Sequence, residues 1–207
     1  EEINSSCKKI VSIQNVLNGY VRPFAWRGSE MMGVSAQKTK INVAIATWEW
    51  GDYFDPKLKT EGIKLNISNW RRPAPNTIPW DSKAAGLYMI CSLSKHEAEK
   101  KGFDDALMLD YRGFIAEATG ANIFFVKKGE LFTPVADCFL DGITRQTVIQ
   151  IAKDNNFVVN EGHYKPEFLL DCDESFLTGT AVEITPVQSV DDYIFGEREI
   201  TKKLITE

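Results

Sequence analysis

The sequence predicts a mixed α+β protein with two domains. Near its start, apolar residues recur at helical spacing and indicate an amphipathic helix ending at Gly19, whose apolar face carries Ile10, Val11, Ile13, Val16 and Leu17. Strand-like and helical patterns are mixed along the rest of the chain, with no internal repeat and no low-complexity segment. A chain of 207 residues is long enough for one large domain or two smaller ones.

The first half contains three β-rich runs followed by a proline-rich segment. Strands are expected in "YVRPFAW" (20–26), "INVAIATWEW" (41–50) and "GIKLNISNW" (62–70). The second run is apolar enough to be a buried strand, and a loop over 27–37 separates it from the first. Proline fixes φ and disfavours helix at the preceding residue, so an extended linker is predicted at Pro73, Pro75 and Pro79. The predicted organisation is a small domain over 1–72, a linker over 73–81 and a large domain over 82–207.

The second half is predicted to open with a helix over 84–101 that ends at Gly102. A β-meander follows, with turns at Gly113 and Gly129 and strands over 105–110, 114–118, 122–127 and 131–134. The remaining elements are predicted to be a helix over 144–155, a strand over 157–164, a short helix over 165–171 and strands over 174–179 and 183–190.

Composition limits the classes of function. Apolar residues make up 43% and charged residues 26%, the balance of an ordinary soluble protein. The net charge of −5, without clustered Lys or Arg, argues against nucleic-acid binding. No run is apolar enough for a membrane span or a signal peptide, so the cytoplasm is the expected location. The four cysteines lie far apart without metal-ligand spacing, and we expect reduced thiols and no metal site.

Lys83 is the first residue whose setting suggests chemistry. Most lysines are solvated surface residues, which is the ordinary interpretation here as well. The small residues that follow, Ala84, Ala85 and Gly86, leave room for a planar group to approach the backbone, and the preceding prolines make that approach rigid. A lysine in a partly desolvated pocket is the residue type that forms Schiff bases with carbonyl cofactors.

Two further segments could bind anions, and one strand carries a carboxylate. "DGITRQ" (141–146) begins a predicted helix, where free N–H groups favour an anion, and "TGTA" (178–181) offers hydroxyls and a glycine, although either could be an ordinary cap or turn. Glu117 lies in the apolar run "FIAEATGANIFF". It either faces outward on its strand or is buried with a partner, for which a protonated pyridine nitrogen is suitable.

The order and spacing of four motifs resemble the class IV family of pyridoxal-phosphate-dependent aminotransferases: "SKAAGLY", "ALMLDYRGFIAEATGANIFFVKKGELFTP", "DGITRQTVI" and "FLTGTAVEITPV". Upstream, "YVRPFAWRGSEMMGV", "WEWGDYF" and "NWRRPAPNTIP" resemble its branched-chain amino acid aminotransferase branch. The resemblance covers essentially the whole chain. It implies the fold-type-IV architecture, a small α/β domain plus a larger β-rich domain with flanking helices.

The resemblance implies roles for the cofactor-binding residues. Lys83 matches the lysine that links to the cofactor and later moves a proton, and it is therefore expected to be poorly solvated. Tyr88 matches the tyrosine that hydrogen-bonds the phenolic oxygen of pyridoxal 5'-phosphate, and Glu117 matches the acid that keeps its pyridine nitrogen protonated. The phosphate contacts of the family match Ile143, Thr144 and Thr180.

Substrate contacts are implied in the same way. Ala181 and its adjoining backbone, together with Tyr20 and Arg22 on one face of a strand, match the groups near the substrate carboxylate. Trp50 and Tyr53 are candidate walls of an apolar slot, or else ordinary core residues. The family arginine that also grips the phosphate lies upstream of the "YVRP" strand and has no counterpart here, so we expect this chain to be a piece of a longer polypeptide, cut short also in its last helix.

The resemblance implies an enzyme that moves the amino group of leucine, isoleucine or valine to 2-oxoglutarate in a ping-pong pair of half-reactions. It also implies a homodimer or higher homo-oligomer in which a neighbour's loop closes the pocket. The alternatives are a D-amino-acid aminotransferase or an aminodeoxychorismate lyase of the same fold, and a catalytically idle relative used for binding. The intact Lys83, Tyr88, Glu117 and Thr144 argue against the idle relative.

Overall fold

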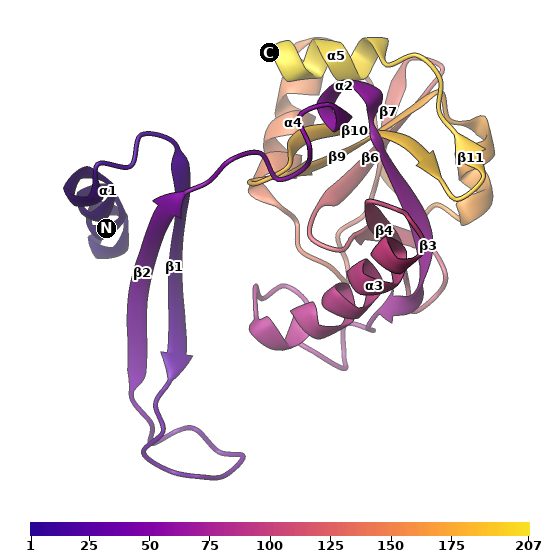
Figure 1. Ribbon diagram of the computed structural model, residues 1–207. Coiled ribbons are helices and arrows are strands. Elements are labelled where there is room, and N and C mark those ends of the chain that lie inside the picture. The colour runs from indigo at the N-terminus through magenta and orange to yellow at the C-terminus, as the bar shows by residue number, and fades with distance from the viewer. The chain divides into compact units, whose positions relative to one another are not determined.

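The computed structural model describes all 207 residues, which form two compact units, 1–52 and 53–207 (Figure 1). The first unit contains helix α1 (Glu2–Gln14) and an antiparallel hairpin of β1 (Gly19–Arg27) and β2 (Ile41–Glu49). The register places Tyr20 opposite Trp48 and Arg22 opposite Ala46. The two predicted strands and the loop between them are therefore confirmed.

Two details of the first unit differ from the prediction. Helix α1 ends at Asn15, whose left-handed backbone (φ 53°) directs its N–H to the carbonyl oxygen of Ser12, whereas Gly19 begins β1. Asparagine tolerates this conformation and so ends the helix earlier than the glycine would. In addition, no residue of β2 is fully buried in the chain, although its apolar sequence predicted a buried strand.

The second unit is built on a nine-stranded sheet with the order β5-β4-β3-β10-β9-β6-β7-β8 and with β11 on β10. Its strands are β3 (Ile63–Arg72), β4 (Asp105–Asp110), β5 (Ile115–Ala118), β6 (Asn122–Lys127), β7 (Glu130–Pro134), β8 (Val159–Gly162), β9 (Glu174–Gly179), β10 (Glu183–Val190) and β11 (Tyr193–Ile194). The β3–β4, β3–β10 and β7–β8 pairs are parallel and the others are antiparallel. The predicted α+β class is confirmed.

Helices cover this sheet and contribute to its core (Figure 1). They are α2 (Leu58–Glu61), α3 (Tyr88–Lys100), α4 (Ile143–Asp154), α5 (Glu199–Thr206) and the 3₁₀ segments η1 (Ala85–Leu87) and η2 (Pro166–Asp171). Beneath α4 and α5, Phe124 and Phe176 stack with ring centroids 5.1 Å apart, and Val148 and Leu204 pack against them. No helix is both long and apolar enough to cross a membrane.

The strand order changes two sequence predictions. The run predicted as one meander forms two separate hairpins, β4–β5 and β6–β7, because β3, β10 and β9 lie between them. The compact units divide after Asp52 and not at the prolines of 73–81, because β3 pairs with β4 and β10 within the second sheet. The proline segment therefore joins β3 to η1 within one unit. The strand predicted over 157–164 is shorter, Val159–Gly162.

Candidate active site

Glu117 lies on β5 and is held from both sides. Its Oε1 is 3.4 Å from Nε of Arg72 at the end of β3, and its Oε2 accepts a hydrogen bond of 3.2 Å from Nδ2 of Asn122 at the start of β6. All three side chains are buried. Of the two interpretations of Glu117, the outward-facing one is therefore wrong, and the carboxyl group is buried with partners.

Burial is the main cause of an altered acidity at Glu117. Removal from water raises the pKa of this carboxyl from its ordinary 4.5 to about 7, although the positive charges of Arg72 and Lys83 act in the opposite direction. The effect of Lys83 indicates that the lysine lies within electrostatic range of the acid. A carboxyl group tuned to the neutral range is typical of functional sites.

Asn122 connects this acid to the beginning of α4. Its Nδ2 also donates to the carbonyl oxygen of Leu140 at 2.9 Å, and its Oδ1 accepts from the N–H of Gly142 at 3.2 Å. Gly142 is the residue before α4 and caps it without a side chain. Ile143 and Thr144 form the first turn, where N–H groups lack intrahelical partners. The side chain of Ile143 is exposed and that of Thr144 is half-buried.

The turn between β9 and β10 lies beside the same residues. The ladder pairs Gly179 with Glu183, which leaves Thr180, Ala181 and Val182 at the tip; Thr180 is exposed, Ala181 is half-buried and Val182 is buried. Thr178 lies opposite Asn122 in the β6–β9 ladder, and its buried Oγ1 has no hydrogen-bond partner. Asn122 thus bonds Gly142 of one predicted anion-binding segment and pairs with Thr178 of the other.

Lys83 lies directly before Ala84, the N-cap of the 3₁₀ segment η1, and its side chain is exposed. The expectation of a poorly solvated lysine is therefore wrong for this chain, in which the neighbouring Ala85 and Gly86 are exposed as well. A Cβ added at Gly86 would meet no atom within 4 Å, which confirms that this segment has open space. Tyr88, the first residue of α3, is half-buried.

Tyr53 lies close to Tyr88 in the second unit. Burial raises the pKa of Tyr53, and the charges of Asp105, Glu99 and Tyr88 add to the increase. Nζ of Lys95 is 5.8 Å from the centre of the Tyr53 ring. Tyr53 remains 41% exposed, so it is not an ordinary core residue.

The other predicted substrate residues belong to the first unit. Tyr20 and Arg22 lie on one face of β1, as predicted, with Tyr20 half-buried and Arg22 exposed. The Tyr20 ring centroid is 5.4 Å from that of Trp48 and 5.5 Å from that of Trp50. Trp50 therefore belongs to an aromatic group on the hairpin.

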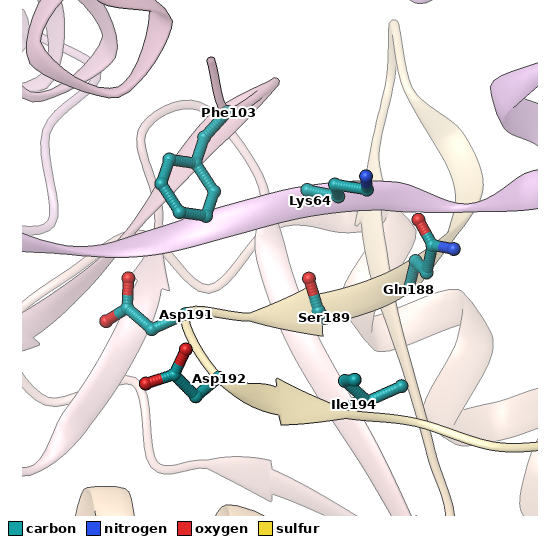
Figure 2. Close-up of a pocket in the computed structure, with 7 residues that line it drawn as sticks. All are labelled: Lys64, Phe103, Gln188, Ser189, Asp191, Asp192 and Ile194. Carbon is teal, nitrogen blue, oxygen red and sulfur yellow. The ribbon is translucent and has the colours of Figure 1, made fainter. Parts of the chain in front are cut away.

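Two other features of the second unit have structural explanations. A hollow where β3, β10 and β11 meet contains no predicted site residue and is lined by Lys64, Phe103, Gln188, Ser189, Asp191, Asp192 and Ile194 (Figure 2). Asp191 is occupied there as an acceptor for the N–H of Ile67 at 3.1 Å. Asp110 and Asp137 approach Cys138, but the Arg112 guanidinium pairs with both carboxylates at 2.7 and 2.9 Å and supplies the positive charge.

Sequence reasoning missed Arg72 and Asn122. Both are ordinary polar residues in their local context, and their role arises only when β3, β5 and β6 bring them to Glu117. The general rule that a buried carboxylate needs a partner was the one available signal, and it does not say which residue supplies the partner.

The gathered groups define a class of protein. A lysine in an open segment, a buried acid of near-neutral pKa and two turns suited to anions are the groups that an enzyme needs to hold a planar, phosphorylated cofactor. A family model described as amino-transferase class IV matches residues 1–190. The chain therefore belongs to the class IV aminotransferase family.

Similar proteins carry a narrower name. A probable branched-chain-amino-acid aminotransferase of Rickettsia bellii is 42% identical over 100% of this chain and 72% of its own length. The branched-chain-amino-acid aminotransferase of Escherichia coli K12 is 38% identical over 99% of this chain and 68% of its own. A crystal structure of the Escherichia coli enzyme matches with a TM-score of 0.95 at 38% identity, covering 98% of this chain and 68% of that one. The branched-chain amino acid aminotransferase of Thermobaculum terrenum in its PLP-form matches with a TM-score of 0.87 at 30% identity, covering 96% and 66%.

Proposed function

We propose that the protein uses pyridoxal 5'-phosphate to move the amino group of leucine, isoleucine or valine to 2-oxoglutarate. The observation that carries the proposal is the buried Glu117, paired with Arg72 and Asn122 and within electrostatic range of Lys83, beside two turns suited to a phosphate. The names of the similar proteins support the substrate class.

Each residue of the second unit has a role in this proposal. The cofactor, when bound, supplies an electron-withdrawing ring that makes a proton at the substrate Cα removable. Lys83 would hold the cofactor through its Nζ and would carry the proton to and from the substrate Cα. Glu117 holds a proton at the ring nitrogen, and Tyr88 donates a hydrogen bond to the ring oxygen. The phosphate is bound by the first turn of α4, with Ile143 and Thr144, and by Thr180.

Substrate contacts are proposed for each unit by itself. In the second unit, the backbone around Ala181 binds the substrate carboxylate and Tyr53 lines an apolar slot for the branched side chain. In the first unit, Tyr20 and Arg22 are proposed as carboxylate contacts and Trp50 as an apolar wall, on the resemblance to the family alone. The second substrate, 2-oxoglutarate, carries an additional carboxylate, so a polar group is needed at the rim of that slot.

We further propose that the protein works in the cytoplasm as a homodimer or higher homo-oligomer in which a loop of the partner closes the pocket. The large exposed side chains of Met31, Met32 and Val34 in the β1–β2 loop support this assembly. Light scattering of the purified protein tests it, and a monomeric mass in the active preparation contradicts it.

The function is tested by absorption spectroscopy of the protein with pyridoxal 5'-phosphate, followed by addition of leucine. We expect a band near the visible that bleaches with leucine and returns with 2-oxoglutarate, whereas D-alanine, the control substrate, leaves it unchanged. Lys83→Ala is expected to remove the covalent link and leucine transamination. The proposal is wrong if no band forms, if D-alanine replaces leucine, or if Lys83→Ala retains the activity.

A further inference from the structure

Asn122 uses both ends of its side-chain amide. Its Nδ2 donates to Oε2 of Glu117 at 3.2 Å and to the carbonyl oxygen of Leu140 at 2.9 Å, while its Oδ1 accepts from the N–H of Gly142 at 3.2 Å. The side chain is only 6% exposed, and the donors and the acceptor fit these partners in one orientation of the amide alone. Asn122 therefore has a fixed position between two parts of the site.

The approach of Gly142 to this amide is close. A Cβ placed on Gly142 would lie 2.5 Å from Oδ1 of Asn122, so a larger residue would displace the beginning of α4 or the asparagine. Glu117 is equally constrained, because Arg72 lies 3.4 Å from the oxygen that Asn122 does not bind. The acid and the helix start are thus each held directly against the same side chain.

We propose that Asn122 is a positioning residue that couples the acid serving the ring nitrogen to the phosphate-binding turn of α4. This inference rests on the proposed function, because it assigns the two ends of one rigid ligand to Glu117 and to the α4 turn. A rigid ligand binds tightly only when both of its contact points keep a fixed separation, and Asn122 sets that separation in advance. If Asn122 only fixed the loop before α4, its bond to Leu140 would be sufficient, and its bond to Glu117 would have no explanation.

Asn122→Asp separates the two contacts. Aspartate keeps an acceptor for the N–H of Gly142, but it replaces the donor to Glu117 and to the carbonyl oxygen of Leu140 with a second carboxyl oxygen. We expect weaker binding of pyridoxal 5'-phosphate in this variant, with the loss growing as pH rises, because two adjacent carboxyls resist joint ionisation. In Asn122→Ala both contacts are lost, and we expect the dissociation constant to rise by about 10-fold or more at every pH.

A double-mutant cycle tests the coupling itself. Dissociation constants for pyridoxal 5'-phosphate are measured by fluorescence quenching for Glu117→Gln, Thr144→Ala and their combination, in the full chain and again in an Asn122→Ala background. We expect the two effects to be non-additive by about three-fold or more with Asn122 present, and additive without it. A merely structural role would change stability but would not remove a coupling between two other residues.

Asn160 provides the matched control. It also donates to a glutamate and to a backbone carbonyl, at 2.9 Å to Glu130 and 3.4 Å to Leu131, but on β8. Asn160→Ala should leave the coupling unchanged. The inference is overturned if the effects of Glu117→Gln and Thr144→Ala are additive in the protein that retains Asn122. It is also overturned if their coupling persists in the Asn122→Ala background. In either case, tight cofactor binding would still support the proposed function. Absence of cofactor binding in the unsubstituted protein overturns the function.

Discussion

Replacing Glu117 with glutamine should stabilise the cofactor-free protein at alkaline pH and have much less effect in acid. Burial raises the pKa of this carboxyl from 4.5 to about 7 in the folded chain. Between these two values the folded protein keeps a proton that the unfolded chain has released, so the free energy of unfolding falls as pH rises. Glutamine has nearly the same shape and no charge to bury, and therefore avoids this loss.

The magnitude follows from the same pKa values. A rise from 4.5 to about 7, at about 1.4 kcal/mol per pH unit, corresponds to a loss of about 3 kcal/mol in the unsubstituted protein at pH 8. The attraction of Arg72 and Lys83 for the ionised carboxyl is already part of that pKa. The stability advantage of Glu117→Gln should therefore grow from pH 4.5 to pH 7 and stay constant above it.

Urea unfolding of both proteins between pH 4.5 and pH 8.5 measures this difference, with hydrogen exchange of β5 and β6 to follow the second unit separately. Glu167→Gln removes an exposed carboxyl from η2 and serves as the control. A difference between Glu117→Gln and the parent that does not change with pH would refute the reasoning, because it would mean that burial does not perturb Glu117.

Three further substitutions have expected outcomes. Gly86→Leu enters open space, so stability should change by less than about 0.5 kcal/mol in thermal unfolding, while cofactor affinity measured by fluorescence falls clearly. Arg145→Met removes a buried guanidinium that donates hydrogen bonds to Asp141 and Glu161 at 2.6 Å each. Chemical unfolding should show that the free energy of unfolding falls by about 3 kcal/mol. Arg145→Lys should not restore it, because a lysine ammonium cannot make both bonds with the geometry of the planar guanidinium. Glu174 caps the start of α5, because its carboxylate accepts hydrogen bonds from the N–H groups of Ile200 and Thr201 and from the Thr201 hydroxyl. Glu174→Ala should lower the stability of α5 by about 1–2 kcal/mol, seen as faster hydrogen exchange in that helix. These predictions are contradicted by an unchanged cofactor affinity in Gly86→Leu, an unchanged stability in Arg145→Met or an unchanged hydrogen exchange of α5 in Glu174→Ala.

Local patterns predicted most of the elements correctly. Strands of the second unit such as β9 and β10 coincide with the predicted ranges, and α3 ends at Lys100, just before the predicted stop Gly102, whose φ is +82°. These features depend on propensity and spacing, which nearby residues determine. Helix α1 is an exception, because it ends at Asn15 in a left-handed conformation, whereas the predicted stop, Gly19, begins β1.

The sequence by itself determined which segments carry the site: an open lysine segment, a strand with one carboxylate and two turns suited to anions. Only the tertiary structure decided that Glu117 is buried, that Arg72 and Asn122 are its partners, and that β3 belongs to the second unit. The physical reason is that the burial and charge pairing of a strand residue depend on which strands flank it. That order joins segments far apart in the chain, and no local pattern of residues encodes it.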